Sequence, residues 1–126
     1  MKIIQSEFSA QETGDRLVEK IGDEGWHVFA IIDHAKQAQD KGLDLRPTQV
    51  VLFGNPHIGT LLMQDQQTSA IDLPAKVLIW EDENADVLIA YNTSDWLKER
   101  HQLTDDATVQ KIGEVLESVC QFAAKA

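Results

Sequence analysis

The segment Gly54-Asn55-Pro56-His57 contains residue types that could bind an anion. Asn is favourable just before a helix and Pro fits the first helical position, so a helix should begin here. The free backbone N–H groups and the dipole of a helix N-terminus attract negative groups, and Gly54 has no side chain to obstruct their approach. This turn is therefore a candidate site for a carboxylate or a phosphate.

Two cations could complete such a site. Arg46 precedes the strand that leads into the turn, and Lys76 begins another strand. If both converge on the turn, Arg46 can hold an anion through two parallel hydrogen bonds. The favoured alternative is plainer: Asn and Pro only start the helix, and Arg46 pairs with Asp44 or Asp72.

Asp33 and His34 form a second candidate site. Asp33 should cap a short helix, which places His34 in the positive first turn, where imidazolium is disfavoured. A neutral imidazole oriented by Asp72 could act as a general base, so a hydrolase or lyase of a small acid is one hypothesis. No nucleophile motif such as G-x-S-x-G accompanies these residues, and Cys120 falls on the apolar side of the last predicted helix. We therefore favour a structural cap over catalysis.

Metal binding is a third possibility. The chain has four histidines: His27, His34, His57 and His101. None of them shows the H-x-x-x-H or H-E-x-x-H spacing that places two ligands on one helical face. A site would need His34 and His57 to meet Asp33 or Asp72 from separate loops. We therefore predict no metal and no cofactor.

Tyr91 and Asn92, together with Trp80, are a fourth candidate. In one interpretation, Trp80 and Tyr91 are cross-strand neighbours that only stabilise a hairpin, and Asn92 only turns the chain. In the other interpretation, Tyr91 and Asn92 offer hydrogen bonds into a pocket lined by Trp80. The burial of these side chains distinguishes the two.

Composition excludes several classes of function. The chain has 126 residues with 11 Lys and Arg against 21 Asp and Glu, which gives a formal net charge of −10. Such an excess of negative charge repels nucleic acid, whose binding rests on Lys and Arg. No apolar run approaches the roughly 18 residues of a membrane span. The single cysteine fits a reducing compartment, so we expect a cytoplasmic protein with no membrane or nucleic-acid partner.

These candidate residues must be positioned by the predicted elements. Apolar runs predict strands at 3–8, 26–32, 50–53, 77–80 and 87–91. Residues 26–32 are apolar at nearly every position and should form a central strand. Polar residues typical of helix starts are Ser9, Asp33, Asn55 and Thr104. Asn84 is the residue best suited to positive φ in the hairpin between the last two strands.

The order of these elements predicts the fold class. It reads β-α-β(4)-α, an α+β fold with an antiparallel-rich sheet, two long helices on one face and short inserted helices. No repeat, linker or low-complexity tract divides the chain. Residues 1–126 should therefore form a single domain.

Four strings of the sequence resemble one known family. They are IIDHAKQA, GLDLRPTQVVLFGNPHIGTLLM, IDLPAKVLIWED and YNTSDWLKERH, which occupy most of residues 31–101. Their order and spacing are similar to those of domain-of-unknown-function family 302. The resemblance implies a fold like that of the TATA-box-binding-protein class and assembly as a homodimer, but it implies no established reaction. TATA-box binding does not follow from a shared fold.

Our favoured hypothesis is a non-enzymatic, homodimeric domain that binds or senses a small anionic metabolite. The pocket would form where loops 33–34, 54–60 and 71–76 meet the sheet. The alternatives are an enzyme with His34 as base, with Asp33 and Asp72 as weaker catalytic candidates, or a purely structural or interaction module. The predicted ligand-binding residues are Asp33, His34, Arg46, Gly54, Asn55, His57, Thr60, Asp72, Lys76 and Asn92.

Overall fold

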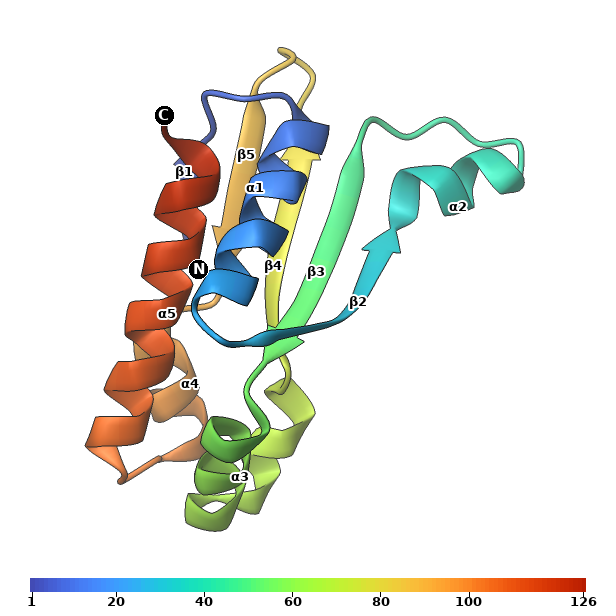
Figure 1. The fold of residues 1–126 in the computed structure, drawn as a ribbon. Coiled ribbons are helices and arrows are strands. Elements are labelled where there is room, and N and C mark those ends of the chain that lie inside the picture. Colours follow the sequence, from blue (N-terminus) through green and yellow to red (C-terminus); the bar gives the residue numbers. More distant parts are fainter.

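The computed structural model describes residues 1–126 and contains one five-stranded antiparallel sheet in the order β1-β5-β4-β3-β2 (Figure 1). Its strands are β1 (Lys2–Gln5), β2 (His27–Asp33), β3 (Thr48–Gly54), β4 (Ala75–Glu81) and β5 (Val87–Tyr91). The helices are α1 (Ala10–Asp23), α2 (His34–Asp40), α3 (Pro56–Asp65), α4 (Ser94–His101) and α5 (Asp106–Ala124), with a 3-10 helix η1 (Gln67–Asp72). The predicted α+β class and element order are confirmed.

Local hydrogen bonds explain where the first three helices begin. The Ser9 hydroxyl accepts from the Glu12 backbone N–H at 3.1 Å, and an Asp33 carboxylate oxygen accepts from the N–H of Lys36 at 2.9 Å. Asn55 caps α3 in the same way. Each of these side chains satisfies a backbone donor that has no partner inside its helix. The predicted helix starts at these three residues are confirmed.

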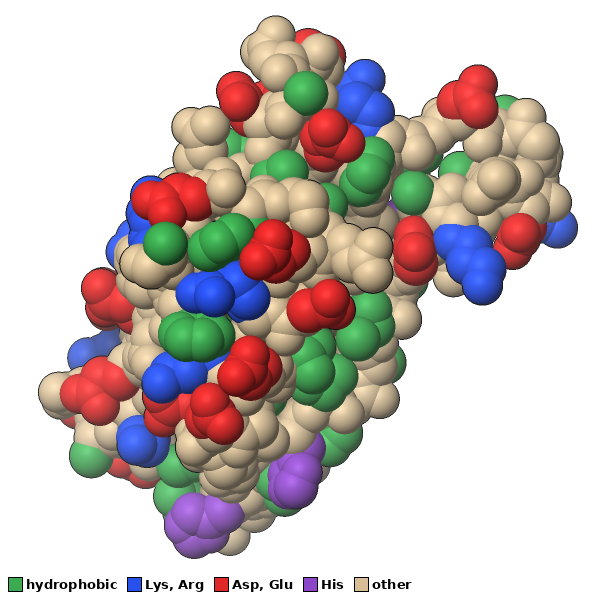
Figure 2. Space-filling model, turned by 45° about the horizontal axis from the view of Figure 1, so that its top comes forward, with side chains coloured by type: hydrophobic (Ala, Val, Ile, Leu, Met, Phe, Trp, Pro, Cys, Tyr) green, Lys and Arg blue, Asp and Glu red, His purple; other side chains and the backbone are tan.

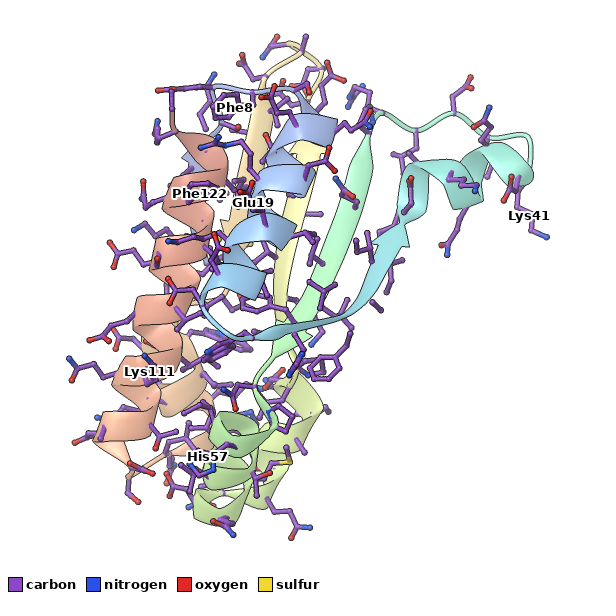
Figure 3. The ribbon with its side chains drawn as sticks, viewed as in Figure 1. Phe8, Glu19, Lys41, His57, Lys111 and Phe122 are labelled. Atoms are coloured by element: carbon purple, nitrogen blue, oxygen red, sulfur yellow. The ribbon has the colours of Figure 1, made fainter.

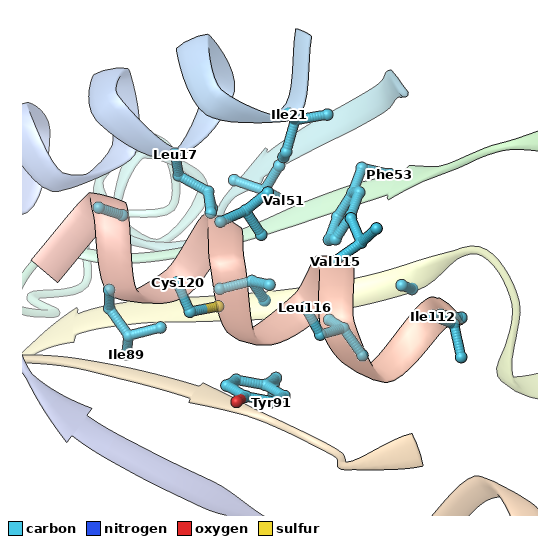
Figure 4. Close-up of a cluster of buried hydrophobic side chains, with 14 of the residues drawn as sticks. Leu17, Ile21, Val51, Phe53, Ile89, Tyr91, Ile112, Val115, Leu116 and Cys120 are labelled. Atoms are coloured by element: carbon cyan, nitrogen blue, oxygen red, sulfur yellow. The ribbon is translucent and has the colours of Figure 1, made fainter. Parts of the chain in front are cut away.

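The long helices α1 and α5 lie side by side across one face of the sheet, as predicted (Figure 1). Leu17 and Ile21 of α1 and Phe53 of β3 are fully buried between them and the sheet (Figure 4). Burying each side chain of this size contributes roughly 1.5–3 kcal/mol. Cys120 lies on the buried face of α5, where the sequence placed it, and burial raises the pKa of its thiol to about 12.

The predicted central position of residues 26–32 is wrong, because β2 is an edge strand. It pairs only with β3, and a bulge between Val28 and Ala30 inserts Phe29 as an extra residue. Phe29 and Ile31 are consequently half-exposed. The continuous apolar run reflects exposed apolar residues on an edge rather than burial on both faces of a central strand.

Residues 34–47, which we call the arm, project from the sheet beyond β2 (Figures 1 and 2). The arm comprises α2 and the loop that leads to β3, and α2 has no buried residue. Gly42 adopts φ +74° directly after α2, which a side chain would strain. The arm carries two exposed leucines, Leu43 and Leu45.

Four finer predictions are also wrong. Asp105, not Thr104, caps α5 by accepting from the Thr108 N–H at 3.2 Å. The positive φ of the hairpin falls on Ala85, at 64°, because the Asp82 carboxylate accepts two backbone N–H groups and sets the turn. Trp80 lies opposite Leu88, not beside the buried Tyr91. The first strand is shorter than predicted and ends at Gln5.

Candidate functional site

Arg46 does not reach the turn at Gly54. Strand β3 runs from Thr48 to Gly54, and its six residue steps of about 3.3 Å place Gly54 roughly 20 Å from the end of the strand that follows Arg46. The guanidinium Nε donates to the Glu81 carbonyl at 3.3 Å, and another guanidinium nitrogen lies 3.9 Å from the Glu83 carboxylate. Figure 3 shows that His57 on α3 lies at the opposite end of the molecule from Lys41 on the arm. The predicted recess shared by Arg46 and the 54–60 turn is therefore wrong.

The N-terminus of α3 has no free donor for an anion. The Asn55 side-chain oxygen accepts from the N–H groups of His57 and Ile58 at 2.9 and 3.3 Å. The next N–H, that of Gly59, bonds to the Asn55 carbonyl at 2.9 Å, and Pro56 has none. The favoured interpretation is correct that this turn only starts the helix. Its pairing of Arg46 with Asp44 or Asp72 is wrong, because Arg46 contacts Glu81 and Glu83.

His34 is not oriented by Asp72. His34 is exposed at the start of α2, where Asp33 serves as the helix cap. Asp72 ends η1 and binds His101 instead. The predicted arrangement of Asp72 behind His34 is therefore wrong, and the proposed general base lacks its orienting carboxylate.

Of the three segments predicted to form one pocket, 54–60 and 71–76 meet, but 33–34 does not join them. They form a largely apolar recess of about 350 Å³, which we call the α3 recess. Its walls include Trp26, Phe29, Pro56, Ile58, Met63 and Leu73, and three predicted residues, Gly54, Asn55 and Thr60, also line it. The Phe29 ring lies over Gly54, where an added Cβ would be only 3.3 Å from Cε2 of that ring. The β2 bulge thus turns an aromatic ring onto the rim of the recess.

Three other predicted residues, Asp72, Lys76 and Asn92, line a separate crevice of about 50 Å³ beside α4. Leu73 and Ala75 border both this crevice and the α3 recess, so the two hollows are neighbours. The crevice has room for little more than a water molecule or a small ion. Six of the ten predicted ligand-binding residues therefore line these two hollows, and His57 lies nearby on α3.

Asp72 belongs to a hydrogen-bonded network that the sequence did not reveal. One carboxylate oxygen lies 2.5 Å from Nε2 of His101 and 2.9 Å from Nε of Arg100. The second ring nitrogen of His101, Nδ1, lies 3.0 Å from the Thr68 hydroxyl. The His101 side chain is only 5% exposed, whereas that of Arg100 is 49% exposed. We call Thr68, His101 and Asp72 the Thr68 network.

Two opposing effects set the pKa of Asp72. Partial burial disfavours the carboxylate, but the hydrogen bond from His101 and the charge of Arg100 outweigh it and lower the pKa. Asp72 and His101 are far apart in sequence, and no spacing rule joins them. The sequence therefore carries no local signal that joins them.

A larger groove lies between α1 and the arm. This arm groove holds about 680 Å³, and both polar and apolar side chains line it. Gln11 and Asp15 come from α1, Ile31 from β2, and Leu43 and Leu45 from the arm. Of the predicted residues, Asp33 lies here.

The structure contains no group of three or more His, Cys, Asp or Glu side chains that could hold a metal ion. None of its helices combines the length and apolar character needed to cross a bilayer.

Comparison with solved structures identifies a similar fold. The crystal structure of an uncharacterized conserved protein DUF302 from Bacillus stearothermophilus superposes with a TM-score of 0.84. The match covers 97% of this chain and 96% of the other, at 21% sequence identity. At this identity the likeness concerns the fold alone.

Curated relatives share more of the sequence. The chain is 37% identical over 123 residues to proteins named fluoride-specific ion channel FluC 1 from Brucella suis and Brucella abortus. These matches cover 96% of this chain but only 48% and 46% of the two relatives. The chain thus spans about half the length of the curated relatives it matches.

The family assignment follows from residues 2–119, which match the model of one family over nearly the whole chain. That family agrees with the solved structure of the same fold. The chain belongs to the family described as domain of unknown function DUF302.

Proposed function

We propose that this chain is a homodimeric binding domain whose two copies associate through β2 and the arm. The observation that carries the proposal is the concentration of exposed apolar side chains there. Their exposed fractions are 55% for Phe29, 51% for Ile31, 65% for Leu43 and 49% for Leu45. An edge strand with such residues invites pairing with another chain unless it is covered.

A second copy suits this surface for two reasons. Each copy carries both an arm and an arm groove. In a contact with two-fold symmetry, the arm of each copy can therefore lie against the groove of the other, so that the same surface is covered on both copies and none is left free. The exposed side of α1 carries Glu12, Asp15 and Glu19, whereas the arm carries Lys36 and Lys41. Lysines on the arm of one copy can thus face carboxylates on α1 of the other.

Sedimentation equilibrium tests the dimer. The wild-type chain should sediment with the mass of two copies, and a Leu43→Asp, Leu45→Asp variant should sediment as a monomer with unchanged circular dichroism. Ile71→Asp is the matched control, because Ile71 is also exposed but lies on η1 at the other end of the sheet. A wild-type monomer, or a dimer that survives both arm substitutions, would contradict the proposal.

The α3 recess supports small-molecule binding. Its volume of about 350 Å³ lies within the usual range for ligand pockets of roughly 300–1,000 Å³. Its walls are mainly apolar, and Arg46 and the α3 N-terminus offer no charge to it. We therefore assign it a compact ligand with an apolar body, in place of the anionic metabolite first expected.

Thermal unfolding with benzyl alcohol and with benzoate tests this assignment. A ligand that binds only the folded state raises the unfolding temperature, so the uncharged alcohol should stabilise the protein more than the anion does. Gly54→Val should abolish the shift, because its side chain would occupy the space under the Phe29 ring. Gly22→Ala is the control, since a Cβ there meets nothing within 4 Å. An equal shift in both variants would rule out the recess as the binding site.

A second candidate function is an accessory domain of a fluoride channel, and the Brucella relatives favour it. Because no helix of this fold can cross a membrane, the other half of those proteins would form the channel. In vesicles, deleting the half that matches this chain should change the rate or regulation of fluoride efflux. Unchanged efflux over a range of fluoride concentrations would remove this candidate.

A further inference from the structure

We propose that the Thr68 network is an acyl-transfer centre in which the Thr68 hydroxyl accepts an acyl group from a small activated ester. This activity goes beyond the proposed binding function, and none of its three residues lines the α3 recess. It also differs from the enzyme hypothesis based on His34, because Asp72 orients a different histidine.

The geometry matches the arrangement of an activated nucleophile. The hydroxyl of Thr68 and Nδ1 of His101 are 3.0 Å apart, within the range of about 2.6–3.2 Å expected for a nucleophile and its base. The carboxylate of Asp72 contacts the other ring nitrogen, as the third member of such a group does. Two segments thus place nucleophile, base and orienting acid in order: η1 carries Thr68 and Asp72, and the end of α4 carries His101.

The carboxylate also determines which ring nitrogen of His101 carries the proton. Asp72 is an acceptor only, so Nε2 must donate to it. In the neutral ring, Nδ1 then has its lone pair directed toward the Thr68 hydroxyl and can accept its proton. Arg100 donates to the same carboxylate oxygen at 2.9 Å, which helps to keep Asp72 ionised for this purpose.

The base and the nucleophile differ in their exposure to water. His101 is almost completely shielded from water, whereas Thr68 is exposed. The hydroxyl is therefore accessible to a substrate while its base remains in a fixed, desolvated position. Because Thr68 lies on an open surface, the fitting substrate class is a short acyl group on a good leaving group.

The step balances without a cofactor. The Thr68 oxygen attacks the acyl carbon, and its proton passes to Nδ1 of His101. The carbon–oxygen bond to the leaving alcohol then breaks, and His101 returns the proton to that alcohol. Water hydrolyses the acyl-threonine by the same route, which releases the acid and restores the hydroxyl.

p-Nitrophenyl acetate is the probe for this proposal. The wild-type protein should release nitrophenol with an initial burst, and peptide mass spectrometry should find one acetyl group on Thr68. Thr68→Ala should reduce release to the buffer rate, and Thr68→Ser should retain it. His101→Gln should lower it by about 10²–10⁴-fold, the usual contribution of a general base.

Thr48→Ala is the matched control, because the Thr48 hydroxyl bonds to a backbone carbonyl instead of a histidine. If the network were only structural, the variants would change the unfolding midpoint and leave acetyl transfer unaltered. Thr68→Ala keeps the test decisive even if His101→Gln fails to fold, because Thr68 is a surface residue. Wild-type release by Thr68→Ala, or acetylation elsewhere only, would overturn the proposal.

Discussion

Replacing Asp72 by Asn should destabilise the fold through the loss of a single carboxylate. One of its oxygens receives hydrogen bonds from His101 and Arg100 at 2.5 and 2.9 Å. Asn has nearly the same shape but carries no charge. The substitution therefore removes the charge from both hydrogen bonds and changes the packing little.

The two bonds contribute unequally. A hydrogen bond to a charged group contributes about 1.5–3 kcal/mol, and the 5% exposure of His101 places its bond in this range. The Arg100 side chain is 49% exposed, so solvent reduces its pairing to about 0.2–1 kcal/mol. Because Asn can still accept a weaker hydrogen bond, we expect Asp72→Asn to lower the free energy of unfolding by about 2 kcal/mol at pH 7.

The effect should depend on pH in a defined direction. The pKa of Asp72 in the folded protein is lower than the ordinary value of 3.8, so folding favours the ionised form. The stability that ionised Asp72 contributes is complete above the ordinary pKa. It disappears as the pH falls through the lower pKa of the folded state. The difference between wild type and Asp72→Asn should therefore shrink below about pH 4, where unfolded carboxyls take up protons.

Urea unfolding at pH 7 and at pH 3 measures both quantities. An unchanged dependence on urea concentration would show that the same surface unfolds in both proteins. If Asp72→Asn lowers the free energy of unfolding at pH 7 by less than about 0.5 kcal/mol, the Asp72–His101 pair contributes no more than an exposed pair does. A difference that persists undiminished at pH 3 would mean that packing, not charge, is responsible.

Three further predictions concern other parts of the chain. Gly113→Ala should cost about 1–3 kcal/mol in urea unfolding, because the new Cβ would lie 3.1 Å from Cβ of Ser94 where α5 packs on α4. Cys120 should react with a disulfide reagent at pH 8 only after unfolding in urea, since burial raises the pKa of its thiol to about 12 and keeps it protonated. Arg46→Ala should change the free energy of unfolding by less than about 0.5 kcal/mol and should not alter benzyl alcohol binding, because its ion pair is exposed and distant from the α3 recess.

The helix starts could be predicted because their causes are local. Ser9, Asp33 and Asn55 each bond to backbone groups two or three residues ahead, so the sequence itself contains both partners. The cap of α5 was misplaced by one residue for a related reason. Thr104 has the right chemistry, but Asp65 from α3 binds its hydroxyl and backbone N–H, and Asp105 takes over as cap.

The position of a strand in the sheet could not be predicted in this way. Residues 26–32 are as apolar as a central strand, yet they form the edge. Strand order depends on which distant segments pair, and an apolar run fits either a strand buried between two neighbours or an exposed edge strand. The exposure of Phe29 and Ile31 distinguishes the two only once the sheet is assembled.

The sequence alone determined the class of fold and the helix starts at Ser9, Asp33 and Asn55, because apolar periodicity and capping chemistry are encoded within short windows. Its motifs also identified the family. Tertiary structure decided the rest of the site. An extended strand places Arg46 and Gly54 at opposite ends although they are close in sequence. The docking of α4 against η1 brings Asp72 to His101, which only packing of distant segments can arrange.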